Sequence, residues 1–597
     1  MVVSRLASAD STEASRRTHA AGIARGAAVL AVLTILSRSF GLLRTLAFSQ
    51  TVGATCLGTS FVTANQVPNL VYELVLGGAL SSVMVPVLAR SAARSATDPA
   101  EKAHVRQIAS ALLTWTVLIL VPITLAIVLA AGPIATALNP VNHSAQCVHS
   151  QVVAMTADML RVFAPQAILY GLSVVLFGLL QAYRRFAAYA LSPLVASLVA
   201  IASYIVFVPL GKGVPLGQLS LSAQLVLSVG ATLGISMLVV VALVPTWRLR
   251  LRLRPALRLP PGVARRAGAL AVVGLAEIIA SEISAVVIIE LANGRGSTGA
   301  LVIYNYANQV FSTMNAVLAL SVVLSAFPVL AATDGTVFNR TAAGSTRAVL
   351  LVSCLGMALT AAVAVPAAHV LAQQPDQVSQ LIQAFVLFAP GLVAMGVIAN
   401  LSRVMLAIGR LTIAAVAVAG SWILAIVAQL ILIQFAHSTL VVGTLALGVS
   451  LGQIGAAIPL VVVTRRIRGK AALEGTGRAM LAGAAAAVAA GAVGVAVSLA
   501  LPRSHKLLDA GDAVLAAVLA AAVFALVAFA LDASDVRALL ARLRPALSNA
   551  GLLLRVLRGP GRAGRAGSAG TAGQAGRTDG ADDTGESQRA TVTGRSD

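Results

Sequence analysis

Residues 37–90 read SRSFGLLRTLAFSQTVGATCLGTSFVTANQVPNLVYELVLGGALSSVMVPVLAR. The stretch contains two long apolar runs, and the first of them carries Arg38 and Arg44. An arginine inside a membrane costs about 2.5–3.5 kcal/mol on insertion scales, so such a side chain usually faces a protein-lined cavity rather than lipid. We therefore expect Arg38 and Arg44 to mark the path of a substrate.

The composition of the whole chain excludes an ordinary soluble protein. Of its 597 residues, 58% are hydrophobic and 11% are charged, and the mean hydropathy is +0.90. Only 4% are aromatic, so the apolar runs consist mainly of small aliphatic residues. Small side chains allow close helix packing within a bilayer. The composition therefore predicts a membrane protein built from closely packed helices.

Apolar segments of about 20 residues, the length that spans a bilayer, occur about fourteen times. The first is too rich in arginine for a cleavable signal peptide and is expected to remain as a helix. The sequence thus predicts an all-α polytopic membrane protein with about fourteen transmembrane helices. The segments lie near 26–50, 61–90, 108–138, 152–181, 186–210, 218–246, 267–293, 299–331, 345–372, 379–408, 411–436, 439–463, 479–502 and 512–531.

Basic residues gather in alternate connectors between these segments, and an excess of Lys and Arg in short loops marks the cytoplasmic side. With both termini in the cytoplasm, every connector fits this rule. The net charge of +22 is then explained by topology, and nucleic acid is not expected as a partner. The inward connectors hold Arg94, Lys102, Arg106, Arg184, Arg185, Arg248, Arg250, Arg252, Arg254, Arg258, Arg265, Arg266, Arg340, Arg347, Arg410, Arg465, Arg466, Arg468, Lys470 and Arg478.

The ends of the chain differ from its apolar centre. Residues 1–25 are expected to form a cytoplasmic N-terminal segment. Residues 464–531 comprise a basic connector and the last two helices. Residues 532–597 begin as a basic stretch that suits anionic lipid, and they end as a Gly-rich tail that is expected to be disordered in the cytoplasm.

Cofactor and metal signals are weak. Cys56, Cys147 and Cys354 are too few and too scattered to predict a disulfide framework, and the histidines near Cys147 are more readily explained by a polar loop than by a metal site. No Walker sequence is present, so ATP-driven transport is not expected. The sequence predicts neither a cofactor nor a metal.

The stretch SRSFGLLRTLAFSQTVGA, followed by ANQVPNLVYELVLGGALSSVMVPVLAR, resembles the first two helices of the MviN/MurJ family, the lipid II flippases of bacterial peptidoglycan synthesis. QAYRRFAAYALSPL at 181–194 resembles the loop between the family's fourth and fifth helices, and residues 304–328 resemble its eighth. The family belongs to the multidrug/oligosaccharidyl-lipid/polysaccharide exporter superfamily. The resemblance implies a transporter of the cytoplasmic membrane that is not an enzyme.

The resemblance also implies an architecture. Two six-helix lobes, here residues 26–246 and 267–463, would face each other across a central cavity. The arginine-rich connector at 247–266 would join them on the cytoplasmic side, and the two extra helices would border a groove for the prenyl tail. No internal repeat is evident in the sequence, so this symmetry rests on the resemblance alone.

A lipid II carrier must shelter a pyrophosphate and a large polar head group. Arginine suits the pyrophosphate because its planar guanidinium donates paired hydrogen bonds and stays charged. Ser37, Gly41 and Arg44 share one helical face. Each arginine has an alternative: Arg44 could pair with Glu73 or Glu282, and Arg38 could snorkel to the cytoplasmic face. The expected substrate-binding residues are Ser37, Arg38, Arg44, Asn69, Asn308 and Gln309.

The seventh segment adds carboxylates that the resemblance does not explain. Glu277, Glu282 and Glu290 lie in one apolar run. Glu282 and Glu277 are candidates for coupling transport to a cation or proton gradient. The alternatives are a salt bridge to Arg38 or Arg44, or a carboxyl group protonated by burial.

The chain departs from the family pattern where the family usually carries charge. Thr45 and Thr59 stand at or near acidic positions, and Tyr72 and Gln309 at or near basic ones. Three functions therefore stay open: a lipid II flippase, an exporter of another polyprenyl-linked saccharide or of drugs, and a membrane scaffold that recruits cell-wall or division proteins. A membrane glycosyltransferase is disfavoured because no acidic catalytic pair is evident.

Overall fold

The computed structural model describes residues 33, 36–74, 91–92, 94–95, 98–143, 146–183, 185–258, 263–501 and 506–541, with the backbone alone at 186, 263–274 and 507. All of them belong to one compact unit, residues 1–549. The N-terminal segment, the second half of the second apolar run and the Gly-rich tail lie outside the described residues.

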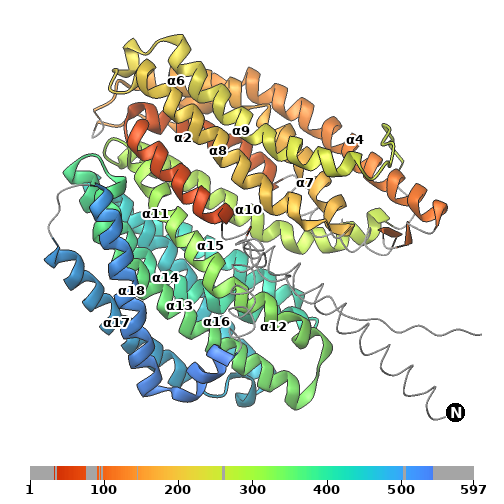
Figure 1. Ribbon diagram of the computed structural model, residues 1–597, viewed down its shortest axis with the longest axis vertical. Coiled ribbons are helices and arrows are strands. Elements are labelled where there is room, and N and C mark those ends of the chain that lie inside the picture. The colour runs from red at the N-terminus through yellow and green to blue at the C-terminus, as the bar shows by residue number, and fades with distance from the viewer. Residues whose placement is uncertain are drawn as a thin grey trace, which may run out of the picture. The chain divides into compact units, whose positions relative to one another are not determined.

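Every regular element in the described ranges is helical, so the all-α prediction is confirmed (Figure 1). Eleven of the described helices are long and apolar enough to cross a membrane. The three other predicted segments correspond to the helix at 36–51, to α2 and to α10. The helices are α2 (Cys56–Tyr72), α4 (Pro99–Leu129), α5 (Ala131–Leu138), α6 (His149–Phe163), α7 (Gln166–Ala182), α8 (Phe186–Gly211), α9 (Leu221–Trp247), α10 (Val263–Arg295), α11 (Ala300–Met314), α12 (Leu320–Ala332), α13 (Gly335–Leu371), α14 (Pro375–Ala407), α15 (Leu411–Leu432), α16 (Val441–Arg468), α17 (Thr476–Ala500) and α18 (Lys506–Leu531).

Contacts between the helices divide them into two groups, one earlier and one later in the chain. Helix α2 packs on α6 and α7, and α9 packs on α7 and α8. Phe48 of the first helix packs against Phe61 and Tyr204, so that helix joins the same group. Further along, α14 packs on α13 and α16, and α15 packs on α10 and α16. We call the first group, through α9, the N-terminal bundle and α10–α16 the C-terminal bundle; α17 and α18 pack on α13.

Small residues set the closest helix contact in the C-terminal bundle. A Cβ atom at Gly452 of α16 would lie 2.4 Å from the backbone nitrogen of Ala425 in α15. Only glycine permits this approach, and one turn earlier Gly448 lies in the same way against Gln429. In lipid, where apolar burial does not favour association, close backbone packing stabilises such helix pairs.

Bends in the helices have two different local causes. Helix α6 ends at Phe163 and α7 begins at Gln166, so the helix breaks at Pro165. The α11–α12 pair is instead interrupted by a π-helical turn, Asn315–Ala319, ahead of Pro328 in α12. A π turn carries one extra residue and displaces the backbone ladder, and it is frequent at functional sites.

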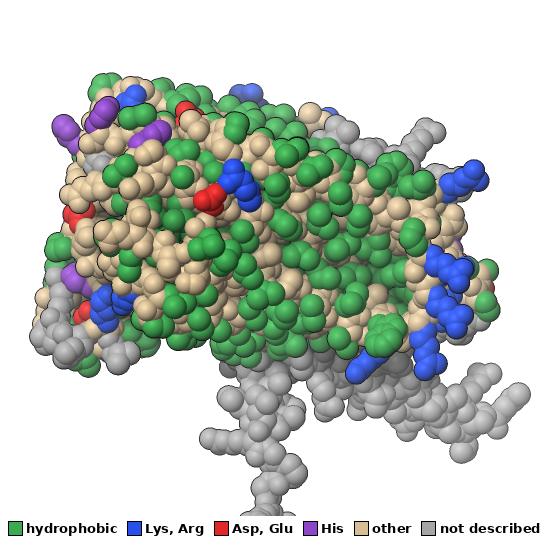
Figure 2. All heavy atoms as spheres, turned by 90° about the horizontal axis from the view of Figure 1, so that it is seen from above, with side chains coloured by type: hydrophobic (Ala, Val, Ile, Leu, Met, Phe, Trp, Pro, Cys, Tyr) green, Lys and Arg blue, Asp and Glu red, His purple; other side chains and the backbone are tan. Residues whose placement is uncertain are grey.

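The two ends of the helical unit differ in chemistry. A disulfide joins Cys56 to Cys147, 91 residues apart, where the sequence predicted no disulfide framework. We call this the disulfide end. The opposite ends of the helices carry the basic connectors, including 248–258, and form the arginine end. Figure 2 shows several Lys and Arg side chains at one end of the visible face, histidines at the other end, and many apolar side chains between them.

The two bundles are joined at the disulfide end. The Asn142 side chain donates to the carbonyls of Asn293 and Gly296 at 2.7 and 2.8 Å, and Gln377 donates to the Ala54 carbonyl at 3.0 Å. Among the described residues, every hydrogen bond between the bundles lies at this end. This structure is therefore closed at the disulfide end.

Candidate functional site

Two adjoining cavities lie along the N-terminal bundle, and α11 of the C-terminal bundle contributes to the lining of both. One, of about 400 Å³, is lined by the first helix, α2, α7, α8, α9 and α11. The other, of about 650 Å³, extends toward the arginine end along the first helix, α7, α8 and α9. Arg44, Tyr170 and Gln309 line both. The two cavities together are called the central cavity below.

The structure brings all six expected substrate-binding residues to the central cavity. Arg44, Asn69, Asn308 and Gln309 line its smaller part, and Ser37 and Arg38 line its larger part. Gly41 also faces the larger part, and a Cβ atom there would meet nothing within 4 Å. Gly41 thus lies against open space rather than a close neighbour.

Both arginines keep their hydrogen-bond donors available. Neither Arg38 nor Arg44 forms an ion pair with a carboxylate in the described part of the chain. The structure does not contain the predicted alternative, a bridge from Arg44 to Glu73 or Glu282. Arg44 instead lines the central cavity together with Tyr170 and Tyr204. Two unpaired guanidinium groups beside a polar cavity form a site for an anion.

The cavity amides divide into two groups. Asn65 donates to Gln166 at 3.2 Å, and Gln166 donates to Thr232 at 2.9 Å, so Asn65 serves helix packing. Gln309 donates to Thr313, one turn along its own helix. Asn69 and Asn308 make no such bonds among the described residues, so their amides can donate to or accept from a bound head group.

Tyrosines of the cavity were missed by the sequence analysis. Five of the seven tyrosines in the chain line the central cavity. Tyr72 and Tyr170 pack together with their ring centroids 4.9 Å apart. Phenols offer both an apolar face and a hydroxyl, which suits sugar rings and peptide groups. The chain has only seven tyrosines, and this scarcity was the signal by which the sequence could have drawn attention to them. The five are Tyr72, Tyr170, Tyr189, Tyr204 and Tyr306.

The acidic candidates lie apart from the cavity lining. Glu282 is half-buried on α10, and the charged group that acts on it is the carboxylate of Glu73 on the other bundle. Glu277 is exposed and interacts with Arg403 of α14, a residue that the sequence analysis did not single out. The predicted alternative, a salt bridge from Glu282 to Arg38 or Arg44, is absent from the described residues.

An apolar groove of about 510 Å³ lies between α13, α14, α16 and α17. Its lining includes Leu350, Met357, Val397, Ile458 and Met480. It lies in the region where the sequence predicted a groove beside the extra helices. In the described residues, no group of three or more His, Cys, Asp or Glu side chains could hold a metal ion.

Two bundles that surround a polar cavity and close at one end define a multi-pass membrane protein with a transporter fold. The fold matches a solved structure of the lipid II flippase MurJ in an inward closed conformation, with a TM-score of 0.64, 14% identity and coverage of 84% of this chain and 98% of that one. An inward-facing multidrug transporter of the MATE family matches with a TM-score of 0.59 and 14% identity, over 75% and 98% of the two chains.

The family model described as lipid II flippase MurJ matches residues 48–529. The chain belongs to this family. Relatives include the probable lipid II flippase MurJ of Rickettsia prowazekii, 28% identical over 31% of this chain and 34% of the relative. The lipid II flippase MurJ of Burkholderia cenocepacia is 28% identical over 30% and 32%. These matches span about a third of the length of the relatives.

Proposed function

We propose that this chain is a flippase that moves lipid II from the inner to the outer leaflet of the cytoplasmic membrane. The observation that carries the proposal is that Arg38 and Arg44 line the central cavity and have no carboxylate partner among the described residues. Lipid II combines a pyrophosphate, sugars and a peptide with a long prenyl tail. The guanidinium groups can bind the pyrophosphate. The tyrosines and the amides of Asn69 and Asn308 can bind the sugars and the peptide, and the apolar groove can hold the prenyl tail.

The proposed mechanism is alternating access without covalent chemistry. The head group enters the central cavity from the arginine end while hydrogen bonds hold the disulfide end closed. Pyrophosphate binding at Arg38 and Arg44 offsets charge repulsion between the two arginines, which favours closure of the arginine end around the head group. The bonds at the disulfide end then break, and the head group leaves on the outer side.

The test of this function is the movement of labelled lipid II across vesicles that contain the purified chain. Competition with another polyprenyl-linked saccharide tests the second candidate cargo. That candidate is supported by Tyr72 and Gln309, which stand at or near positions where the family usually carries basic residues. Stronger inhibition by the other saccharide than by lipid II itself would assign the site to it.

We further propose that the arginine end and both termini face the cytoplasm. In a chain without other cysteines, Lys470→Cys at the arginine end should be shielded from an impermeant thiol reagent in intact cells, because Lys470 is exposed only on the inner side. His143→Cys, exposed at the disulfide end, should be labelled. The reverse pattern would invert the topology and the direction of transport.

We propose that Glu282 takes part in coupling to a cation or proton. Glu282 is a half-buried carboxyl group on an apolar helix, and a carboxylate in such surroundings tends to take up a proton or to hold a cation. Glu282→Gln keeps the shape and removes the charge, so lipid II should still bind while transport loses its dependence on the ion gradient. Glu290→Gln, on the exposed face of the same helix, is the control. Unchanged ion dependence in Glu282→Gln would exclude coupling at this residue.

A further inference from the structure

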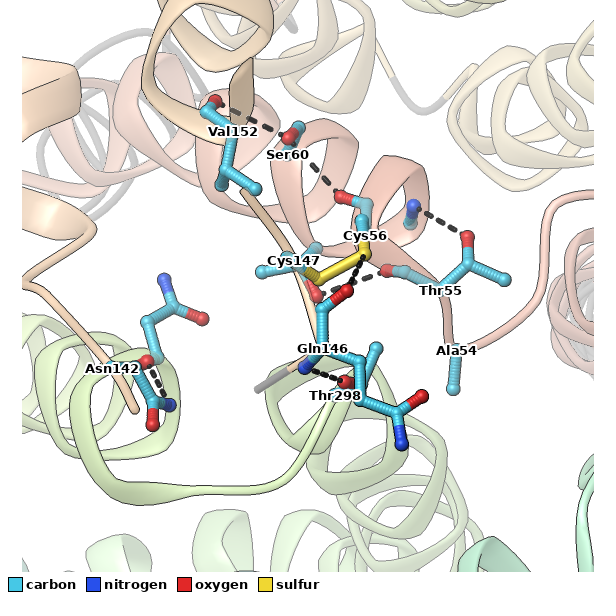
Figure 3. Close-up of a disulfide and its surroundings, with 12 residues drawn as sticks. Ala54, Thr55, Cys56, Ser60, Asn142, Gln146, Cys147, Val152 and Thr298 are labelled. Carbon is cyan, nitrogen blue, oxygen red and sulfur yellow. Dashed lines mark hydrogen bonds between the residues drawn. A yellow bond between two sulfur atoms is a disulfide. The ribbon is translucent and has the colours of Figure 1, made fainter. Parts of the chain in front are cut away.

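The Cys56–Cys147 disulfide lies beside the contact between the bundles (Figure 3). Cys56 begins α2, and Cys147 lies in the connector between α5 and α6, so both belong to the N-terminal bundle. We call the described residues of that connector, 139–143 and 146–148, the seam loop. Its ends are tied by a hydrogen bond of 2.9 Å between the His149 ring and the Asn139 carbonyl. The disulfide adds a covalent tie from the loop to α2.

The seam loop holds the turn between α10 and α11 of the C-terminal bundle. We call residues 293–299 the seam turn. The Asn142 side chain donates to two of its carbonyls, and the backbone N–H of Gln146 donates to the Thr298 hydroxyl at 2.9 Å. In return, Asn293 donates to the Leu138 carbonyl at 2.9 Å and to Thr63 of α2 at 3.0 Å. Figure 3 shows Gln146 between the disulfide and Thr298.

The seam turn is closely packed against residues of the N-terminal bundle. A Cβ atom at Gly294 would lie 2.7 Å from Cγ of Pro140, and one at Gly299 would lie 2.4 Å from the Ala54 carbonyl oxygen. Gly299 has a φ of +80°, which also favours glycine. The seam loop and seam turn therefore fit only while the loop keeps its position, and Gln146 keeps that position because its neighbour Cys147 is bound to α2.

We propose that the Cys56–Cys147 disulfide is a redox-sensitive latch that holds the disulfide end closed. This inference rests on the proposed alternating access and adds a control on it. With the disulfide intact, Gln146 and Asn142 are positioned to bind the seam turn. With the disulfide reduced, the seam loop moves independently of α2, and the closed state loses its advantage over states that are open at this end.

The reductant is a protein or small molecule with two thiols. One of its thiolates attacks a sulfur of the Cys56–Cys147 bond and forms a mixed disulfide, and its second thiol then releases the chain. Two electrons pass to the chain, Cys56 and Cys147 become thiols, and the reductant becomes a disulfide. Reoxidation by a disulfide-bearing partner restores the latch. The partner acts at the disulfide end, which the proposed topology places outside the cytoplasm.

The test measures the distance between the bundles without lipid II. Spin labels carried by non-natural residues at Ser150 and Thr439, both exposed at the disulfide end, report the separation in the purified full chain with Cys354→Ala. Dithiothreitol should raise the ratio of open to closed molecules by about threefold to tenfold, because the reduced latch loses one or two positioned hydrogen bonds. Hydrogen exchange in residues 293–299 measures the same ratio where open molecules are rare.

Two variants keep the result specific. Cys56→Ser with Cys147→Ser should match the reduced chain and should not respond to dithiothreitol. Gly294→Ala should open the seam with the disulfide intact, because its methyl group meets Pro140. Two results would overturn the latch: a ratio that dithiothreitol leaves unchanged in the disulfide-bonded chain, or a ratio that dithiothreitol changes in the double serine variant. If the latch responds while neither the oxidised nor the reduced chain moves lipid II, the proposed function fails and the latch stands.

Discussion

Replacing Arg44 with alanine should abolish lipid II transport while leaving the amount of protein in the membrane unchanged. Arg44 lines both parts of the central cavity and has no carboxylate partner among the described residues. Its removal therefore leaves no buried charge unpaired, and folding should be little affected. Each hydrogen bond between charged groups contributes about 1.5–3 kcal/mol, so loss of a paired contact to pyrophosphate should slow transport by at least about a hundredfold.

Two further variants define the role of Arg44. Arg44→Lys should restore only part of the rate, because lysine keeps the charge but cannot donate the paired bonds. Arg161→Ala is the matched control, since Arg161 lies half-exposed on α6, pairs with Asp158 and lines neither part of the cavity. Complementation of growth together with quantified membrane abundance measures these effects. Full activity of Arg44→Ala would show that Arg44 is not needed for transport.

A covalent link across the disulfide end should stop transport. A Cβ atom at Gly294 would lie 3.6 Å from Cβ of Pro140 on the other bundle. Disulfides require Cβ atoms about 3.5–4.5 Å apart, so Pro140→Cys with Gly294→Cys should form one. In a chain with Cys56→Ser, Cys147→Ser and Cys354→Ala, oxidation should reduce lipid II transport to the level of empty vesicles because the outer exit cannot open.

Reduction separates a locked protein from a damaged one. Dithiothreitol should restore transport in the cross-linked chain, and each single cysteine variant should be indifferent to oxidation. Gel mobility or mass spectrometry measures the extent of cross-linking. A chain that is fully cross-linked and still moves lipid II at the rate of the reduced chain would exclude opening at the disulfide end as a step of transport.

The sequence was sufficient for the helices because their signal is local. Apolar length predicted α13 and α14, and in the structure both begin earlier than the predicted 345–372 and 379–408. At 37 residues α13 is about 55 Å long, so it exceeds the hydrocarbon core of a membrane, which is about 30 Å thick. Its first turns are polar, and hydropathy does not detect such ends.

The candidate site was predictable only in part, because residues that lie close together on two different bundles have no characteristic spacing in the sequence. Arg44 stood out as a charge in an apolar run, and Asn69 and Asn308 were expected because their amides could donate to a polar head group. The pairing of Cys56 with Cys147 depends on how α2 and α6 pack, so cysteine spacing could not indicate it. The surroundings of Glu277 and Glu282 could not be read from spacing for the same reason. Their charged neighbours, Arg403 and Glu73, lie on other helices.

The most direct measurement of the central claim is the initial rate at which labelled lipid II crosses vesicles that contain the purified chain. The account predicts a rate well above that of protein-free vesicles, and a fall to the protein-free rate when Arg44→Ala replaces the wild type at equal protein content. Equal rates for wild-type, Arg44→Ala and protein-free vesicles would contradict the assignment of lipid II transport to this cavity.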